Sequence, residues 1–88
     1  MEGVLAAVAD ESRWKILRKL SMGRMCACEL PGYVGITQPA VSQHLKVLLE
    51  SSLVEVKSEG AKRIYSISQK GRKVLSDVSS WQDTKVRQ

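Results

Sequence analysis

Apolar residues recur at helical spacing in the first part of the chain and again near its end. Asp10 is predicted to cap a helix that ends at Gly23, and a short helix precedes that cap. The apolar faces of these two helices are formed by Val4, Leu5, Val8, Ile16, Leu17 and Leu20. Two amphipathic helices therefore open the chain.

A proline limits where the third helix can begin. The first N–H groups of a helix have no acceptor within it, so Pro31 is tolerated only in the first turn. The helix therefore cannot start much before Cys28, and the segment Glu29 to Val34 is predicted as a short helix closed by Gly35. Thr37 then has the position and side chain of an N-cap for the next helix.

The fourth predicted helix, from about Gln38 to Ser51, has two different faces. Val41, Leu45 and Leu48 share its buried side. The remaining face and flanks carry Gln38, Pro39, Ser42, Gln43, His44, Lys46 and Glu50. Its first two turns present short polar groups rather than Glu–Lys pairs, and amides and hydroxyls can read base edges by hydrogen bonding. An ordinary solvent-facing helix is the alternative interpretation.

Two strands and a last helix complete the pattern. Leu53, Val54 and Val56 lead into the polar turn 58–62, and Ile64, Tyr65 and Ile67 run back from it. Ser68 is predicted to cap a helix from about Gln69, with an apolar face formed by Val74, Leu75, Val78 and Trp81. The short third helix, the Gly35–Thr37 turn and the fourth helix make a helix-turn-helix, and the hairpin after them makes a wing. We therefore predict a mainly α fold with a small β-hairpin (α+β), a winged helix-turn-helix, in a single domain over residues 1–88.

Charge favours a polyanionic partner. The chain of 88 residues has a net charge of +5. The window 57–73 contains six cations (Lys57, Lys62, Arg63, Lys70, Arg72 and Lys73) and one anion, Glu59, so it alone matches the whole surplus. We predict that this surface binds double-stranded DNA; a basic face that is merely solvated is the alternative.

Other classes of protein receive little support from the sequence. There is no apolar run near the roughly 20 residues of a membrane span, and the start lacks the pattern of a signal peptide, so a cytoplasmic protein without a membrane partner is expected. No nucleophile with a base, phosphate-binding glycine loop or pair of carboxylates is evident, so we do not expect an enzyme. In a reducing compartment the two cysteines are expected to be thiols.

The chain resembles the ArsR-type (arsenic repressor) winged-helix regulators. The resemblance is carried by the stretches Ala9–Leu17, Met25–Leu30 and Thr37–Leu48, and by the wing at Leu53–Val54 and Lys62–Tyr65. The resemblance implies a homodimer whose interface is formed by the first and last helices. This dimer would bind an operator, repress transcription, and release the DNA when a metal or metalloid ion binds. The DNA-binding residues predicted from the pattern and this resemblance are Thr37, Gln38, Ser42, Gln43, His44, Lys46, Lys62 and Arg63.

The resemblance is weaker for the sensing site than for the DNA-binding surface. Metalloid-sensing members often have a third thiolate a few residues after a Cys-x-Cys pair, where this chain has Pro31, Gly32 and Tyr33. Other members use an Asp and His cluster on the last helix, and the last helix here carries Asp77 and Asp83 without a histidine.

Cys26 and Cys28 are the candidate ligands of an inducer. Residues i and i+2 of a helix point about 200° apart, whereas in an extended or turn segment two such thiolates can converge on one soft ion. Three interpretations stay open: an inducer site for a thiophilic ion such as arsenite or antimonite, a thiol redox switch, or cysteines without a sensing role. No ion is expected to be needed for folding. A DNA binder without an effector and a winged helix that binds only proteins are the remaining alternatives.

Overall fold

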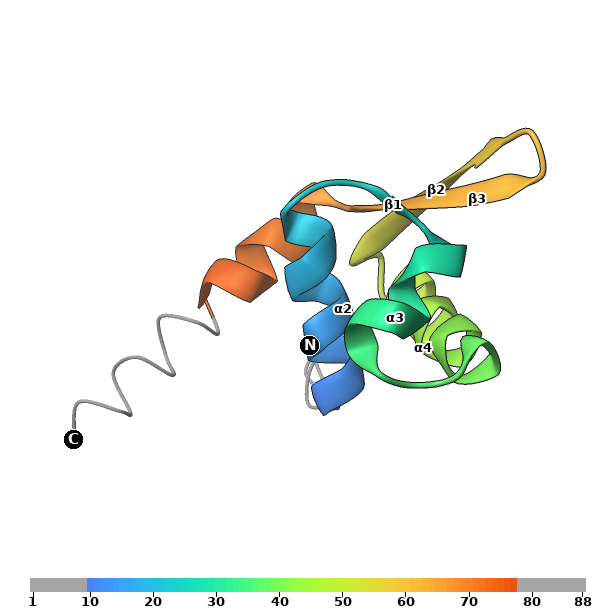
Figure 1. Cartoon of the computed structure of the whole chain (residues 1–88). Helices are drawn as coiled ribbons and strands as arrows, with labels where there is room; N and C mark the ends of the chain where they lie inside the picture. Colours follow the sequence, from blue (N-terminus) through green and yellow to red (C-terminus); the bar gives the residue numbers. More distant parts are fainter. Residues whose placement is uncertain (1–9, 78–88) are drawn as a thin grey trace.

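The structure, a computed structural model, describes residues 10–77, which form three helices, a 3-10 turn, a small sheet and the start of a last helix (Figure 1). The helices are α2 (Glu11–Ser21), α3 (Leu30–Val34) and α4 (Gln38–Glu50), and the 3-10 turn is η1 (Ala27–Glu29). The strands are β1 (Met25–Cys26), β2 (Val54–Glu59) and β3 (Lys62–Ile67). Residues 69–77 are helical. This arrangement confirms the predicted winged helix-turn-helix.

The predicted helix ends agree closely with the structure. Asp10 caps α2, because its carboxylate accepts the N–H groups of Ser12 and Arg13 at 2.8 and 3.2 Å. Thr37 caps α4 through the N–H of Ala40 at 3.4 Å. The hydroxyl of Ser68 accepts the N–H of Gly71 at 2.9 Å and so caps the last helix. Each cap satisfies a donor that has no partner within its helix.

The sheet has three strands, although the sequence analysis predicts two. The extra strand, β1, pairs antiparallel with β3, so that Met25 lies opposite Tyr65 and Cys26 opposite Ile64. A strand of two residues is too short to show an alternating pattern, which is why the sequence does not reveal it. The pairing joins the segment that begins the cysteine pair directly to the return strand of the wing.

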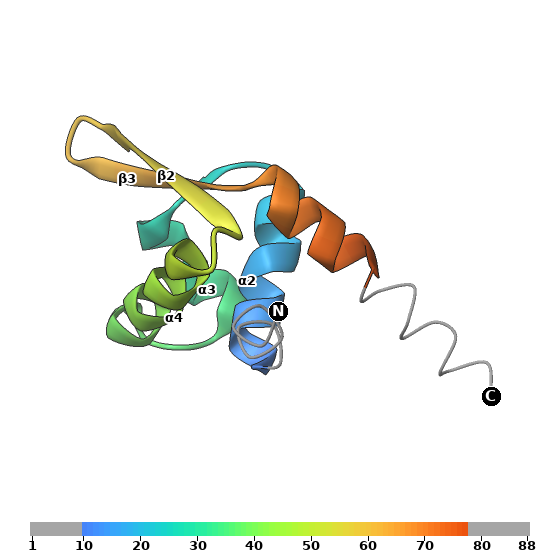
Figure 2. The ribbon, with the colours of Figure 1, turned by 180° about the vertical axis from the view of Figure 1, so that it is seen from behind.

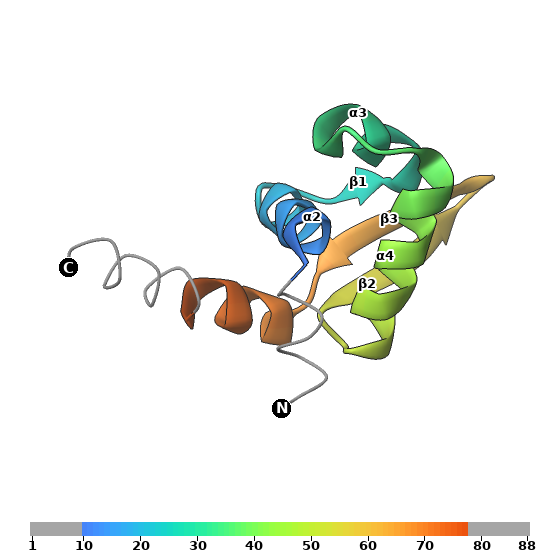
Figure 3. The same cartoon turned by 90° about the horizontal axis from the view of Figure 1, so that it is seen from below.

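The third predicted helix begins two residues earlier than expected and in a different geometry. Its first turn is the 3-10 segment η1, and α3 follows with Pro31 in its first turn. Cys26 therefore lies in extended backbone and Cys28 within a turn, in agreement with the limit that the proline sets. At the other end, Gly35 adopts φ 80°, a left-handed conformation that favours glycine. The short segment that follows α3 leads the chain into α4 (Figure 3).

One apolar core holds the described elements together. Its fully buried centre combines α2, α3, α4 and the segment that enters β2, with Ile16, Leu17, Leu20, Leu30, Val41, Leu45, Leu48 and Leu53. Val74 and Leu75 of the last helix are half-buried against this core. The hairpin of β2 and β3 projects beyond the helices (Figures 1 and 2), so its far end is free to meet a partner.

Part of the predicted dimer interface lies outside the described residues. This applies to Val4, Leu5 and Val8 of the first helix and to Val78 and Trp81 of the last one. Within residues 10–77, no helix combines the length and the apolar character that a membrane span requires.

Candidate nucleic-acid interface and cysteine pair

Helix α4 presents a row of polar side chains to solvent. Its buried face is held by Val41, Leu45 and Leu48, as predicted. Gln38, Ser42, Gln43 and Lys46 are all exposed, and the last three line a hollow of about 350 Å³ together with Pro39. Thr37, at the start of the helix, is exposed as well. These donors and acceptors are free of the core and can face the edges of bases.

His44 lies apart from this exposed row. Its side chain is half-buried, and it is one of the groups that affect Asp10, the cap of α2. The pKa of Asp10 is lowered, mainly by the hydrogen bond from the N–H of Arg13, with smaller contributions from Ser12 and His44. Among the predicted DNA-binding residues, His44 is the one that is half-buried; the others are exposed.

The wing carries exposed cations on both strands. Lys57 is on β2, and Lys62 and Arg63 begin β3. Near the tip, Glu59 pairs with Arg24 at 3.3 Å, and this ion pair links the wing to the loop before β1. Both partners are largely exposed, so the pair contributes little stability, but it neutralises the one carboxylate closest to the turn. Within residues 10–77, Lys62 and Arg63 take part in no ion pair.

Two neighbouring hollows join the wing to the helix-turn-helix. One, of about 320 Å³, lies between α4 and the sheet and is lined by Ala27, Ser42, Leu45, Lys46, Leu49, Arg63 and Tyr65. The other, of about 300 Å³, is lined by Cys26, Ala27, Cys28, Gln38, Ala61, Lys62 and Arg63. We call the second one the cysteine hollow. Arg63 and Ala27 border both, so the structure brings five of the eight predicted DNA-binding residues together around these hollows: Gln38, Ser42, Lys46, Lys62 and Arg63. Thr37, Gln43 and His44 line neither hollow.

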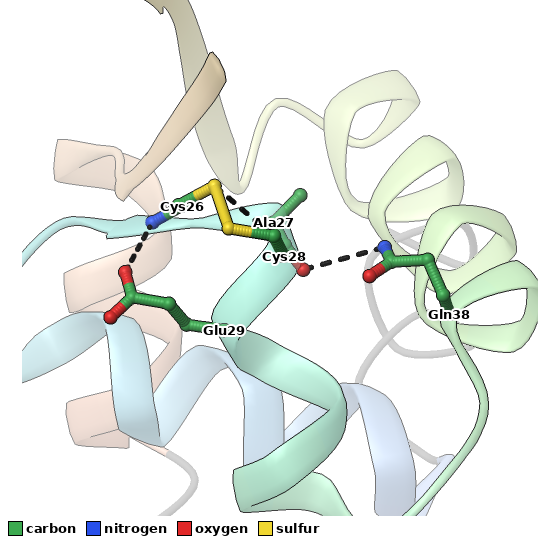
Figure 4. The surroundings of a disulfide bond; sticks show 5 residues. All are labelled: Cys26, Ala27, Cys28, Glu29 and Gln38. Atoms are coloured by element: carbon green, nitrogen blue, oxygen red, sulfur yellow. Dashed lines mark hydrogen bonds between the residues drawn. A yellow bond between two sulfur atoms is a disulfide. The ribbon is translucent and has the colours of Figure 1, made fainter.

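The two cysteines lie where the sheet meets the helix-turn-helix (Figure 4). Cys26 is only 5% exposed, whereas Cys28 is exposed. The N–H of Cys28 donates to Sγ of Cys26 at 3.2 Å, and the N–H of Cys26 donates to Oε1 of Glu29 at 3.1 Å. These reciprocal bonds form a capping box, which fixes the position of both residues at the start of η1.

The state of the cysteines differs from the expected one. The structure joins Cys26 and Cys28 in a disulfide, with their Cα atoms 5.2 Å apart, where the sequence analysis expects free thiols. The physical reason is the local backbone: an extended residue followed by a turn brings the i and i+2 side chains to one side. The same convergence is what a shared soft ion would require, but the sulfurs bind an ion only after reduction to thiolates.

The described residues offer no further ligands for such an ion. Within 10–77, no group of three or more His, Cys, Asp or Glu side chains is placed to hold a metal. A two-sulfur site would therefore take its remaining ligands from solvent, from a small molecule, or from parts of the protein beyond these residues.

A hydrogen bond connects the cysteine segment to α4. Nε2 of Gln38 donates to the carbonyl oxygen of Ala27, between the two cysteines, at 3.4 Å (Figure 4). Sequence reasoning did not identify this contact, nor the ion pair between Arg24 and Glu59. The spacing of Glu29 three residues after Cys26 was a signal for the capping box. Contacts between residues distant in the chain left no such signal.

This fold and its exposed polar helix and basic wing are those of a winged helix-turn-helix DNA-binding protein. Residues 10–56 match the sequence profile of a family described as "Bacterial regulatory protein, arsR family". The chain belongs to this family. The family consists of transcriptional regulators, which confirms the prediction that the protein is not an enzyme.

Individual relatives agree with this assignment. An "Arsenical resistance operon repressor" from Staphylococcus aureus is 35% identical over 75 residues, which is 85% of this chain and 69% of that protein. The crystal structure of NolR from Sinorhizobium fredii aligns with a TM-score of 0.82 at 34% identity, over 90% of this chain and 80% of that one. A homodimeric winged helix-turn-helix DNA-binding domain from Mycobacterium bovis aligns with a TM-score of 0.89 over 97% of this chain and 80% of its own, and at 24% identity it supports the fold alone.

Proposed function

We propose that this protein is a homodimeric repressor that binds an operator and releases it when a thiophilic metalloid ion, such as arsenite or antimonite, binds to Cys26 and Cys28. The observation that carries the proposal is the cysteine hollow. The two sulfurs share it with Gln38, Lys62 and Arg63, which are predicted DNA-binding residues. An ion at the sulfurs therefore lies against the DNA-binding surface, so a long relay between the two sites is unnecessary. The names of the curated arsenical-resistance relatives support this effector class.

In the proposed complex, α4 contacts the bases and the wing contacts the phosphate backbone of the DNA. Gln38, Ser42 and Gln43 offer amide and hydroxyl groups to base edges in the major groove, while Thr37 and Lys46 flank them. Lys62 and Arg63 are placed to neutralise phosphates next to that groove. His44 is half-buried, so it joins this set only if its ring turns outward to the DNA.

The homodimer is supported by the small described core and by a relative of the same fold. Because that core is small, the apolar faces predicted for the first and last helices would gain from burial against a second copy. The Mycobacterium bovis domain of the same fold is described as homodimeric. Two copies related by a twofold axis would present their α4 helices to successive turns of the duplex.

Binding of an ion is coupled to DNA through the backbone around the cysteines. Cys26 is paired with β3 of the wing, and Ala27 accepts the hydrogen bond from Gln38 of α4. An ion bound to both sulfurs closes a ring and fixes the conformation of this segment. If that conformation occurs only in the DNA-free protein, the ion lowers operator affinity by the difference between its binding free energies to the DNA-free and the DNA-bound protein.

The test uses fully reduced protein under anaerobic conditions and a duplex selected from a random library. Fluorescence anisotropy measures operator affinity with and without arsenite. We expect arsenite to weaken binding by about 5- to 150-fold, the usual range of such coupling. Cys26→Ser and Cys28→Ser should each abolish this response and keep DNA binding. The chain has only these two cysteines, so a double variant that responds like the parent would exclude any thiol-based site.

A thiol redox switch is the second candidate, and the disulfide between Cys26 and Cys28 favours it. In this case the oxidised pair fixes the same segment that the ion would fix. The same assay separates the two functions: hydrogen peroxide should release DNA without any metal, and a reductant should restore binding. Arsenite alone should then have no effect on the reduced protein.

A further inference from the structure

The two sulfurs of the disulfide are unequal in access. Both cysteines line the cysteine hollow, but Cys26, in the edge strand β1, is only 5% exposed, whereas Cys28 is exposed. A thiolate arriving from solvent therefore meets Sγ of Cys28. Thiol–disulfide exchange needs the attacked sulfur to be accessible, so this asymmetry selects which cysteine receives an incoming group.

The sulfur of Cys26 is the favoured leaving group in thiol–disulfide exchange. Sγ of Cys26 accepts the backbone N–H of Cys28 at 3.2 Å, and the capping box holds this geometry. When the S–S bond breaks, negative charge collects on Cys26, and a hydrogen bond to that sulfur stabilises the charge. The exposed sulfur has no corresponding donor among the hydrogen bonds of the described residues.

The lining of the cysteine hollow is cationic. Lys62 and Arg63 line the same hollow, and within residues 10–77 neither takes part in an ion pair. No acidic residue lines the hollow; the carboxylate of the adjacent Glu29 is engaged by the N–H of Cys26. The amide of Gln38 and the small side chains of Ala27 and Ala61 complete the lining. At about 300 Å³, the hollow has room for a small organic anion.

We propose that the cysteine hollow is a modification site for small thiols that carry a carboxylate. The thiolate attacks Sγ of Cys28, a new S–S bond forms, the bond between Cys28 and Cys26 breaks, and its electron pair leaves on Sγ of Cys26, which takes up the proton lost by the attacking thiol. No other oxidant or reductant is needed. The carboxylate of the adduct lies against Lys62 and Arg63, and the reverse attack by Cys26 makes the modification reversible.

This modification also bears on DNA binding, and that part rests on the proposed function. A carboxylate on Lys62 and Arg63 occupies the cations that phosphates of the operator would contact. The adduct would therefore release DNA by direct competition at the wing, in addition to any change in the backbone around Cys26.

The experiment measures the first exchange step without DNA. Oxidised protein is mixed at low salt with an excess of 3-mercaptopropionate, 2-mercaptoethanol or cysteamine, which are anionic, neutral and cationic. The freed thiol is trapped by rapid alkylation, and peptide mass spectrometry locates the adduct and the alkylated cysteine. Rates are compared per concentration of thiolate, and each thiol is compared between variants, so that differences in intrinsic nucleophilicity cancel.

We expect the adduct on Cys28 and the alkyl group on Cys26 with all three thiols. The double variant Lys62→Gln/Arg63→Gln should slow the anionic thiol by about tenfold, leave the neutral one nearly unchanged and accelerate the cationic one, with the effect reduced at high salt. Lys70→Gln removes an exposed cation that does not line the hollow and should change none of the rates.

Two results would overturn the proposal: an adduct mainly on Cys26, or equal effects of the wing variant on all three thiols. Because DNA is absent, neither result depends on the proposed function. A separate anisotropy measurement with the purified Cys28 adduct tests the competition with DNA, and unchanged operator affinity there would reject only the competition.

Discussion

The side-chain amide of Gln38, at the first position of α4, donates a hydrogen bond of 3.4 Å to the carbonyl oxygen of Ala27, the residue between the two cysteines. Helix α4 and the cysteine segment are therefore in direct contact. The bond to Ala27 uses one of the two amide N–H groups of Gln38. Gln38, a predicted DNA-binding residue, is therefore also a hydrogen-bond partner of the cysteine segment.

The first prediction follows from this position. Gln38→Ala and Gln43→Ala should both relax sequence preference, each by about 1–3 kcal/mol if the amide contacts a base with two hydrogen bonds. Gln43 is exposed on the same helix but does not line the cysteine hollow, so it is the matched control. Only Gln38→Ala should also reduce the ratio of operator affinities measured with and without arsenite or peroxide. Equal ratios in the two variants would mean that the bond to Ala27 carries no coupling.

The second prediction concerns the wing. Lys62→Ala or Arg63→Ala should weaken binding to any duplex and reduce the slope of log affinity against log salt by up to about one unit per phosphate contact. Lys70→Ala, a control in the last helix, should have a smaller effect on both quantities. The measurement is a series of anisotropy titrations at increasing salt, with random and selected duplexes. An unchanged salt slope in both wing variants would mean that the hairpin does not contact the DNA phosphates.

Much of the fold could be predicted from local patterns. The caps at Asp10, Thr37 and Ser68 and the turn at Gly35 follow from chemistry within four residues of each position, and the structure confirms them. The buried face of α4 follows from its periodicity in the same way. Local sequence is sufficient wherever a side chain caps the helix next to it, or wherever the apolar residues of one helix form a single face.

The candidate site was harder to predict because it depends on distant pairs. The strand β1 forms only because Met25 and Cys26 pair with β3, almost forty residues later in the chain. The cysteine hollow likewise combines the 26–28 segment with Lys62 and Arg63 of the wing. The cysteines and the two wing cations could be singled out from the sequence, but not the hollow that they share or the bond between the sulfurs.

The third prediction concerns pH and the cap of α2. The pKa of Asp10 is lowered, chiefly by the N–H of Arg13, so folding is favoured by the charged form. This contribution is complete above the ordinary pKa of an aspartate and is lost as the pH falls through the lowered value of the folded state. Asp10→Ala should cost about 1 kcal/mol at neutral pH. Asp10→Asn keeps the cap and should reduce the loss of stability in acid, measured by denaturant unfolding between neutral and acidic pH. An identical pH profile in the parent and Asp10→Asn would contradict this account.

The last prediction tests how the final helix is seated on the core. Gly71 lies in the first turn of that helix, against the chain that enters β2. A Cβ at this position would overlap the carbonyl oxygen of Leu53 and lie 2.7 Å from Cγ1 of Ile67. The carbonyl cannot retreat easily, because it accepts the N–H of Ser68 at 3.0 Å. Gly71→Ala should therefore destabilise the fold by about 1–3 kcal/mol, as overpacking does.

Gly32 provides the control for this substitution. It lies in α3, and a Cβ there would meet nothing within 4 Å. Gly32→Ala should therefore leave stability unchanged or raise it by up to about 1 kcal/mol, because alanine loses less backbone freedom on folding. Urea unfolding of the parent and both variants measures the difference. If Gly71→Ala is as stable as Gly32→Ala, the last helix does not pack closely against Leu53. The attachment of this helix would then rest on Ser68, whose hydroxyl donates to the carbonyl oxygen of Ser52 at 2.7 Å, just before β2.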